Sequence, residues 1–383
     1  MALEHLPLSQ LTIQRPKSPL KVSDSSKIGL VPFYTSGVMI ARHSESLCSG
    51  ENIFIATGGK ANFQYWNGPA AYSTDTLVIT GTDRIETKYL YYFLQMKTEH
   101  INEQLFQGAA LKHLSRPAFN NLLVPFRPLL EQMRIVDVVT SVDAYIASLQ
   151  QKAEAARAAR DAVLHELLES VAAAPQRPLK TLTSKIGSGA TPRGGEAGYQ
   201  SSGVTLIRSQ NVRDGRFLHE GLVAIGESAA KALEGVSVEE NDVLINITGA
   251  SVARACIVDQ KILPARVNQH VSILRTDRSQ LLPGFLLQIL LGKKMKSYLL
   301  DISGSGTTRQ AITKAQLDAL EVLVPKLDEQ QRIVDIVLAM DNAIRLTEHA
   351  VTDAQQLRMG MLSDLLSGDH EIPETYDRLL GVA

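Results

Sequence analysis

The sequence is poor in cysteine, in tryptophan and in long apolar runs. Its only cysteines, Cys48 and Cys256, are far apart and stand in no metal-binding or redox spacing. That pattern argues against a disulfide framework and favours a reducing compartment. The apolar windows, such as 281–291, are too short to span a bilayer, and the first residues do not have the pattern of a signal peptide. We therefore expect a cytoplasmic protein that does not contact a membrane.

Motifs that would carry a reaction are also missing. The sequence has neither the glycine-rich cofactor loop nor the Asn/Asp-Pro-Pro-aromatic motif of a DNA amine methyltransferase. Residues 57–61 resemble a phosphate-binding loop, but Phe54 replaces its first glycine and Ala61 its serine or threonine, so we interpret them as a turn after a strand. The histidines form no ligand pair. The sequence thus predicts no catalytic residue, no metal and no cofactor held by the chain itself.

One alternative is an enzyme. Asp75 with Glu86 and Lys88 has the outline of a nuclease centre, in which carboxylates hold a metal ion beside a lysine. Under this hypothesis the chain would cleave DNA without a partner.

The net charge of −1 hides an alternation along the chain. Residues 1–130 carry a net charge of +3 and residues 173–328 carry +5, whereas residues 131–172 carry −3 and residues 329–383 carry −6. Basic surfaces attract phosphates and acidic surfaces are repelled by them. The two basic blocks are therefore the candidates for nucleic-acid binding.

An internal repeat runs through the acidic blocks. The segment Glu-Gln-Met-Arg-Ile-Val-Asp at 131–137 returns as Glu-Gln-Gln-Arg-Ile-Val-Asp at 329–335, an offset of 198 residues. The same register holds for about 60 residues, from Gly108 to Leu168 in the first copy. The regions between the copies look much less alike. The chain therefore alternates variable and constant parts.

Each constant part has the pattern of a long helix. Apolar residues recur at coiled-coil spacing from Ile135 to Leu167 and from Ile333 to Leu365, and Arg160 and Arg358 interrupt both copies at the same place. Neither stretch contains proline, so each helix of some 40 residues would rise about 60 Å. We expect the two helices to pair antiparallel as a spacer. The alternative is that each helix packs only on the core of its own domain.

The fold expected from these patterns is mixed α/β. It comprises a first globular domain at 1–130, a helix at 131–172, a second globular domain at 173–328, a helix at 329–370 and a tail at 371–383. Strands are expected at 52–56, 76–80, 243–247 and 271–274, and short apolar helices at 89–96 and 285–291. With the long helices paired as an antiparallel coiled coil, the molecule would have pseudo-two-fold symmetry.

Clusters of hydrogen-bonding side chains flank the expected strands. Arginine can bind guanine bidentately, and asparagine or glutamine can bind adenine, so such clusters suit the reading of base edges. Hydroxyls and glycine-rich backbone suit phosphates. The competing interpretation is a set of loops closed by their own side chains. The candidate DNA-binding residues are Lys60, Asn62, Gln64, Tyr65, Trp66, Arg193, Arg208, Ser209, Gln210, Asn211, Arg213, Asn246, Thr248, Arg254, Asn268, Gln269, His270, Thr307, Thr308 and Arg309.

The repeated Glu-Gln-x-Arg-Ile-Val segments, each preceded by a Val-Pro pair and ending at Val136 and Val334, resemble those of the specificity subunit of Type I restriction–modification enzymes. The Gly-Thr-Thr loop at Gly306, the strand and turn at 241–249 and the Thr-Pro turn at 191–192 carry the same resemblance, which covers nearly the whole chain. The first copy departs from the pattern, because it has Gly-Ala-Ala where the second has Gly-Thr-Thr.

The resemblance implies two target-recognition domains, each of which reads one half of a split site in double-stranded DNA. It implies two methylation subunits docked on the constant parts, and restriction subunits that complete an endonuclease. S-adenosylmethionine, Mg²⁺ and ATP would belong to those partners, so the chain would be a non-catalytic specificity subunit. The candidate partner-binding and spacer residues are Glu131, Gln132, Arg134, Glu329, Gln330 and Arg332. A coiled-coil adaptor without DNA specificity is the other alternative.

Overall fold

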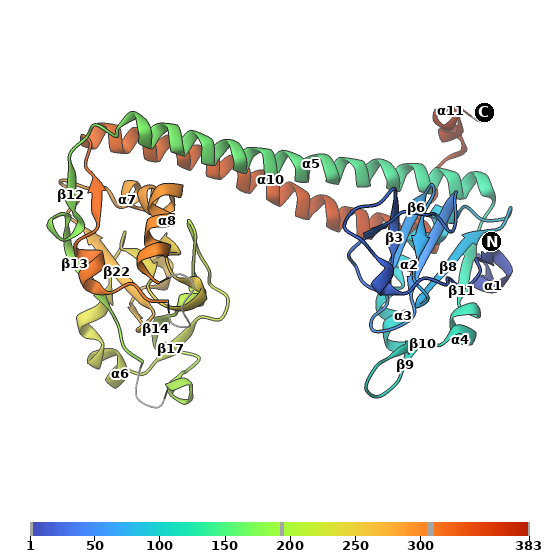
Figure 1. The fold of residues 1–383 in the computed structure, drawn as a ribbon, viewed down its shortest axis with the longest axis horizontal. Helices are drawn as coiled ribbons and strands as arrows, with labels where there is room; N and C mark the ends of the chain where they lie inside the picture. Colours follow the sequence, from blue (N-terminus) through green and yellow to red (C-terminus); the bar gives the residue numbers. More distant parts are fainter. Residues whose placement is uncertain (1–2, 192–194, 305–309, 382–383) are drawn as a thin grey trace. The chain divides into compact units, whose positions relative to one another are not determined.

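The structure is a computed structural model that describes residues 3–191, 195–304 and 310–381. Packing divides the chain into two units, one of Met1–Gln151 with Glu348–Ala383 and one of Lys152–Thr347. Each unit holds one globular head and about half of each long helix (Figure 1). The border between the units therefore crosses both long helices.

The head of the first unit is built on a four-stranded antiparallel sheet in the order β2-β8-β5-β6. Its strands are Thr12–Gln14, Thr76–Gly81, Glu51–Ala56 and Phe63–Asn67. Side chains alternate along a strand. In β5, Ile53 and Ile55 accordingly pack towards α2 (Thr87–Met96), and Phe54 packs with Tyr34 and Tyr72 on the other face. α3 (Thr98–Gln104) follows α2 and contributes Ile101 to the same core.

A smaller sheet lies on the other face of β5. In it β3 (Val31–Tyr34) pairs antiparallel with β4 (Ala41–His43) and parallel with β7 (Ala71–Tyr72). Two short ribbons complete the head. They are β1 (Glu4–Pro7) with β11 (Leu123–Phe126), and β9 (Phe106–Gln107) with β10 (His113–Leu114). The β9–β10 ribbon lies at the end of the head away from the helices (Figure 1). The short helices are α1 (Leu8–Leu11) and α4 (Arg116–Asn120).

The head of the second unit repeats this topology. Its four-stranded sheet is β13-β22-β19-β20, with strands Thr183–Ser188, Val271–Thr276, Val243–Asn246 and Ala255–Ile257. In its second sheet, β17-β14-β21-β18, the strands are Val223–Ile225, Val204–Ile207, Ala265–Val267 and Ser237–Val238. As in the first head, the central strand β14 runs antiparallel to β17 and parallel to β21. The two heads therefore share one plan, although their sequences look unlike.

Several of the remaining elements of the second unit match those of the first. β12 (Gln176–Pro178) pairs with β23 (Glu321–Leu323) as β1 pairs with β11. α7 (Pro283–Leu291) and α8 (Lys293–Ile302) take the places of α2 and α3, and α9 (Lys314–Asp318) takes that of α4. The hairpin of β15 (Val212–Arg213) with β16 (Arg216–Phe217) and the helix α6 (Glu227–Ala232) are found only in this head among the described residues.

The long helices are α5 (Leu129–Ser170) and α10 (Leu327–Ser367). Each begins two residues before the range predicted for it. Within each unit they run antiparallel, which confirms the predicted pairing. Leu362, Leu365 and Leu366 at the end of α10 pack into the core of the first head beside Ile135 and Val139 of α5. The helices therefore do not pack only on their own domains. None of the described helices is long and apolar enough to cross a membrane.

The arginines that interrupt the apolar seam pair across it. In the second unit Arg160 Nε is 2.9 Å from Asp341 Oδ1, and Arg160 Nη2 donates to Gln288 Oε1 at 2.9 Å. In the first unit Arg358 binds Asp143 in the same way. Each residue stands 198 positions from its counterpart, so one ion pair is the copy of the other with the helices exchanged. A charge in an apolar seam is tolerated when it is paired, and such pairs fix the register of two helices.

Candidate nucleic-acid interface

In each head, a glycine in a loop of the four-stranded sheet is hydrogen-bonded to the constant part that follows in the chain. Gly59, in the loop after β5, has φ +84° and donates its N–H to Lys112 O at 2.9 Å. Gly249, in the loop after β19, has φ +71° and donates to Gln310 O at 3.0 Å. Glycine adopts this left-handed conformation without strain. Because Lys112 and Gln310 are 198 residues apart, the turn and its anchor are repeated in both heads.

Basic residues lie beside this turn in the first head. The predicted DNA-binding residue Lys60 follows the turn, and Lys112 is its anchor; both side chains are exposed, and neither has an acidic partner among the described residues. His113 lies beside Gly58 in the same bridge. In the second head the matching anchor follows the Gly-Thr-Thr loop. The predicted residues Thr307, Thr308 and Arg309 of that loop, and Arg193 of the Thr-Pro turn, lie outside the described residues.

Two amides predicted to contact DNA instead support a neighbouring loop. Asn62 Nδ2 donates to Gly37 O at 3.0 Å, and Gln64 Nε2 donates to Gly37 O and to Val38 O, each at 3.2 Å. The supported loop, residues 35–40, joins β3 to β4. These donors are therefore used inside the head, and the loop that they hold is the part that meets solvent.

Tyr65 and Trp66 point to opposite sides of β6, because side chains alternate along a strand. Tyr65 faces α2, where its hydroxyl donates to Glu51 and its ring lies 5.6 Å from Lys88 Nζ. Burial, together with this hydrogen bond, raises the pKa of Tyr65. Trp66 is 41% exposed, and its indole N–H donates to Pro69 O at 3.3 Å. Of these two aromatic side chains, Trp66 is therefore the one that faces solvent.

In the second head the predicted cluster lies on the loop 208–222, which joins β14 to β17. Arg208 Nη2 and Gln210 Nε2 both donate to Gly221 O, at 2.6 and 3.2 Å. Asn211 and Asn246 are fully buried and bind backbone oxygens of the same loop. The two asparagines therefore shape the loop. Gln210 is exposed on it, whereas Arg208 and Arg213 are half-buried.

A second polar group forms where the loops after β19 and β21 meet. The hydroxyl of Thr248 is hydrogen-bonded to His270 Nδ1, and Gln269 Nε2 lies 2.9 Å from His270 Nε2. Asn268 is buried, and its side-chain oxygen accepts the N–H of His270 at 3.0 Å. Arg254 follows on the β19–β20 loop, where it is half-buried and its backbone bonds Ser251 and Asn246. The structure thus brings together predicted residues from two separate stretches of the sequence.

The repeated glutamines, predicted as partner contacts, are buried. Gln132 accepts the N–H of Glu86 at 2.8 Å and donates to Arg84 O and Arg127 O. Gln330 does the same in the second unit, where it accepts the N–H of Leu282 at 2.8 Å and donates to Gln280 O and Pro325 O. Glu86 and Leu282 are the residues that precede α2 and α7. Each glutamine therefore joins the start of a long helix to the start of the helix beneath the sheet.

The remaining predicted partner residues differ between the copies. Arg134 forms a bidentate ion pair with Asp377, at 2.5 and 2.7 Å, and donates to Ile372 O, while Tyr376 donates to Asp137 at 2.9 Å. Asp377 begins α11 (Asp377–Leu380) in the C-terminal tail, and its pKa is lowered by Arg134. The counterparts of Arg134 and Asp137 are Arg332 and Asp335, which are exposed on α10. Glu131 pairs with Arg127, and Glu329 accepts the N–H of Lys326.

The residues of the nuclease hypothesis do not converge. Asp75 precedes β8, whereas Glu86 and Lys88 follow it, so a six-residue strand of about 20 Å separates them. Asp75 is bound by Ser73, and Lys88 lies over two tyrosine rings. Within the described ranges, no group of three histidines, cysteines or carboxylates could hold a metal ion. These three residues therefore do not form the metal site that the nuclease hypothesis requires.

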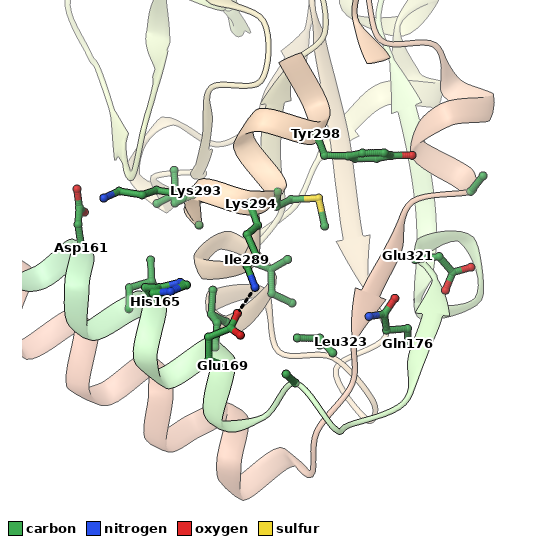
Figure 2. A pocket seen from close by; sticks show the side chains of 17 residues that line it. Asp161, His165, Glu169, Gln176, Ile289, Lys293, Lys294, Tyr298, Glu321 and Leu323 are labelled. Carbon is green, nitrogen blue, oxygen red and sulfur yellow. Dashed lines mark hydrogen bonds and ion pairs between the residues drawn. The ribbon is translucent and has the colours of Figure 1, made fainter. Parts of the chain in front are cut away.

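A recess of about 520 Å³ opens in the second unit between the end of α5 and the corner of α7 and α8 (Figure 2). Asp161, His165 and Glu169 stand on successive turns of α5 and face Lys293 and Lys294. Lys294 Nζ is 2.6 Å from Glu169, and this hydrogen-bonded contact lowers the pKa of Glu169. The lining combines these charged side chains with apolar ones, among them Leu164, Leu168 and Ile289.

Comparison with known proteins gives consistent matches along the chain. A family model described as Type I restriction modification DNA specificity domain matches residues 11–157 and again residues 200–353. The chain is 21% identical to the MjaVIII specificity subunit of Methanocaldococcus jannaschii, a Type I restriction enzyme subunit, over 73% of this chain and 69% of the relative. It is 22% identical to the EcoBI specificity subunit of Escherichia coli, over 83% of this chain and 73% of the relative. A crystal structure of the Type-I restriction-modification system S subunit from M. genitalium shares the fold, with a TM-score of 0.62 at 16% identity and 96% of both chains covered.

Proposed function

The chain belongs to the Type I restriction modification DNA specificity family, and we propose that each of its two heads reads one half of a split site in double-stranded DNA. The observation that supports this most directly is the repeated glycine turn. It places a loop between the main sheet and the constant part at the same position in both heads. Two equivalent heads on one chain can read two unlike half-sites, as the halves of a symmetric dimer read a palindrome.

The residues proposed to contact DNA are those on the outer sides of these loops. Lys60 and Lys112 suit phosphates of the first half-site, and the Gly-Thr-Thr loop with Arg309 suits phosphates of the second. Arg208, Gln210 and Arg213 suit bases. Arg193, Arg254, Gln269 and His270 complete the proposed set, with Trp66 in the first head. The buried asparagines and Asn62 and Gln64 act by holding the loops in place.

The proposed partners are two methylation subunits, one for each copy of the constant part, together with restriction subunits. Rotation of the target adenine out of the helix is the task of a methylation subunit in this scheme. S-adenosylmethionine, Mg²⁺ and ATP are held by the partners. The chain directs their chemistry in the cytoplasm and performs none itself.

The experiment that tests this proposal is a map of DNA methylation. The chain is co-expressed with the methyltransferase encoded beside it, and methylated adenines are located across the host genome. We expect one motif made of two short half-sites separated by a gap of fixed length.

The matched control is the methyltransferase expressed without the chain, which should give no motif. A stable complex that methylates no new site would contradict the proposal and favour a coiled-coil adaptor. A continuous motif without a gap would contradict the assignment of one half-site to each head.

A further inference from the structure

Four strongly exposed apolar side chains of the first head lie on two adjoining segments. Ile28 and Leu30, before β3, are 88 and 85% exposed, and Val38 and Met39, after it, are 75 and 81% exposed. The segments are joined by two backbone hydrogen bonds of 2.9 Å between Ser26 and Arg42. Large apolar side chains that gather in solvent on adjoining segments are typical of an interaction site.

The loop that carries Val38 and Met39 is held from inside the head. The carbonyls of Gly37 and Val38 accept the amide hydrogen bonds of Asn62 and Gln64 described above. The hydroxyl of Ser36 donates to Asp75 O at 2.7 Å and accepts the N–H of Thr57. The carbonyls of Gly37 and Val38 and the hydroxyl of Ser36 are thus bonded within the protein. The side chains of Val38 and Met39 remain exposed on the same loop.

The position of this loop is the same as that of the polar loop in the second head. The loop 35–40 joins β3 to β4, and the loop 208–222 joins β14 to β17. β3 and β14 are the corresponding central strands of the smaller sheets. The connection after the central strand therefore carries Arg208 and Gln210 in the second head and apolar side chains in the first.

Basic residues border the apolar surface. Lys27 and Arg42 line a shallow groove together with Met39 and Ile40. Both cations are exposed, and no acidic partner faces either of them in the described ranges. Apolar side chains between cations suit a ligand that combines negative charge with small apolar groups. Duplex DNA has both, because the 5-methyl group of thymine projects into the major groove between the phosphate chains.

We propose that Val38 and Met39 recognise thymine in the first half-site through its 5-methyl group, with Lys27 and Arg42 on the flanking phosphates. This inference rests on the proposed function and names the chemistry by which the first head reads its half-site. The two heads then use one position of the fold differently. The first reads an apolar group, and the second reads hydrogen-bonding edges.

The test uses uracil, which pairs like thymine but lacks the methyl group. The full chain, assembled with its methylation subunits, is titrated with duplexes in which single thymines of the mapped site are replaced by uracil. We expect uracil at one or two positions of the first half-site to weaken binding about four-fold each, the factor for losing one buried methyl group. In Met39→Ser or Val38→Ser, uracil and thymine duplexes should bind equally at the affected position.

The control variant is Ile13→Ser, which removes an exposed apolar side chain of the same head outside the groove. It should keep the full preference for thymine. Melting curves of the three variants should match that of the unaltered chain, because all three side chains are exposed.

The other possible outcomes of this experiment can be told apart. A first half-site without thymine on either strand overturns the inference, as does specific binding that uracil never weakens. A uracil effect that persists in both loop variants also overturns it, because the methyl group is then read elsewhere. Loss of subunit assembly in Met39→Ser, with DNA preference intact, would make the loop a protein contact. Absence of any sequence-specific binding would instead contradict the proposed function itself.

Discussion

At the scale of single residues, the same side chain can serve a ligand or the fold. Asn62 and Gln64 have the amides that suit adenine, yet their donors are taken by Gly37 and Val38. The sequence could not separate these roles, because it does not show which carbonyls lie near an amide. The repeated glutamines are a similar case. The sequence showed that a glutamine follows a proline in both copies. It did not show that each glutamine makes three internal hydrogen bonds.

We expect Gln330→Ala to lower the free energy of unfolding by about 1–3 kcal/mol, because it leaves the N–H of Leu282 and two buried carbonyls without partners. Gln132→Ala should have a similar effect through the first unit. Equilibrium unfolding in urea measures both.

Gln331→Ala is the matched control, since Gln331 is the exposed neighbour of Gln330 and its side chain donates to Asp335 one turn along the same helix. It should change stability by less than about 0.5 kcal/mol. Equal effects at positions 330 and 331 would show that the internal bonds are not what the repeat maintains.

At the scale of elements, the periodic patterns in the sequence predicted the long helices, but they did not predict the contacts between them. The apolar seam and its interruptions by Arg160 and Arg358 were visible in the sequence. Their pairing with Asp341 and Asp143 was not, because it joins residues about 200 positions apart. The pseudo-two-fold symmetry was predicted from the repeat, but the equivalent sheets of the two heads were not identified in the sequence. Their signal was the short repeat Pro-Leu-x-x-Leu-Thr at 7–12 and 178–183, where the leucines enter the cores of the two heads.

The long helices pass from one unit into the other, and their length should therefore set the gap in the DNA site. We expect insertion of one heptad into the 153–159 stretch of α5, with a second heptad opposite it near Ile344 of α10, to lengthen each helix by about 10 Å. At 3.4 Å per base pair, the mapped gap should grow by about three base pairs. The half-sites should stay the same.

Insertion into α5 alone is the control for this experiment. It shifts Arg160 relative to Asp341 and should destabilise the complex rather than give a clean longer gap. If the double insertion changed the half-sites and left the gap unaltered, the helices would not be the spacer.

At the scale of the whole chain, the two copies of the constant part are unequal. α10 is followed by a tail that covers Arg134 and Asp137 in the first unit. α5 is followed instead by β12, and the corresponding Arg332 and Asp335 stay exposed. The sequence showed that both copies carry the same arginine and aspartate. It did not show that the tail contacts these residues in one copy and leaves them exposed in the other. This difference depends on where the chain after each helix folds back.

We predict that titration with the methylation subunit gives two binding steps of different affinity. The double variant Tyr376→Phe, Asp377→Asn removes the contacts of the tail to Asp137 and Arg134, and it should bring the two affinities together. Isothermal calorimetry measures both steps. Asp369→Asn, elsewhere in the same tail, should leave them apart. Two equal steps in the unaltered chain would contradict this prediction.

A chain with one open and one covered face fills in a fixed order. When the methylation subunit is scarce, each chain would take one copy on the open Arg332 face, and complexes with a single copy would accumulate. Only an excess would displace the tail from Arg134 and add the second copy. The relative expression of the two genes, rather than the affinity of either head for DNA, would then set how many fully loaded complexes a cell contains.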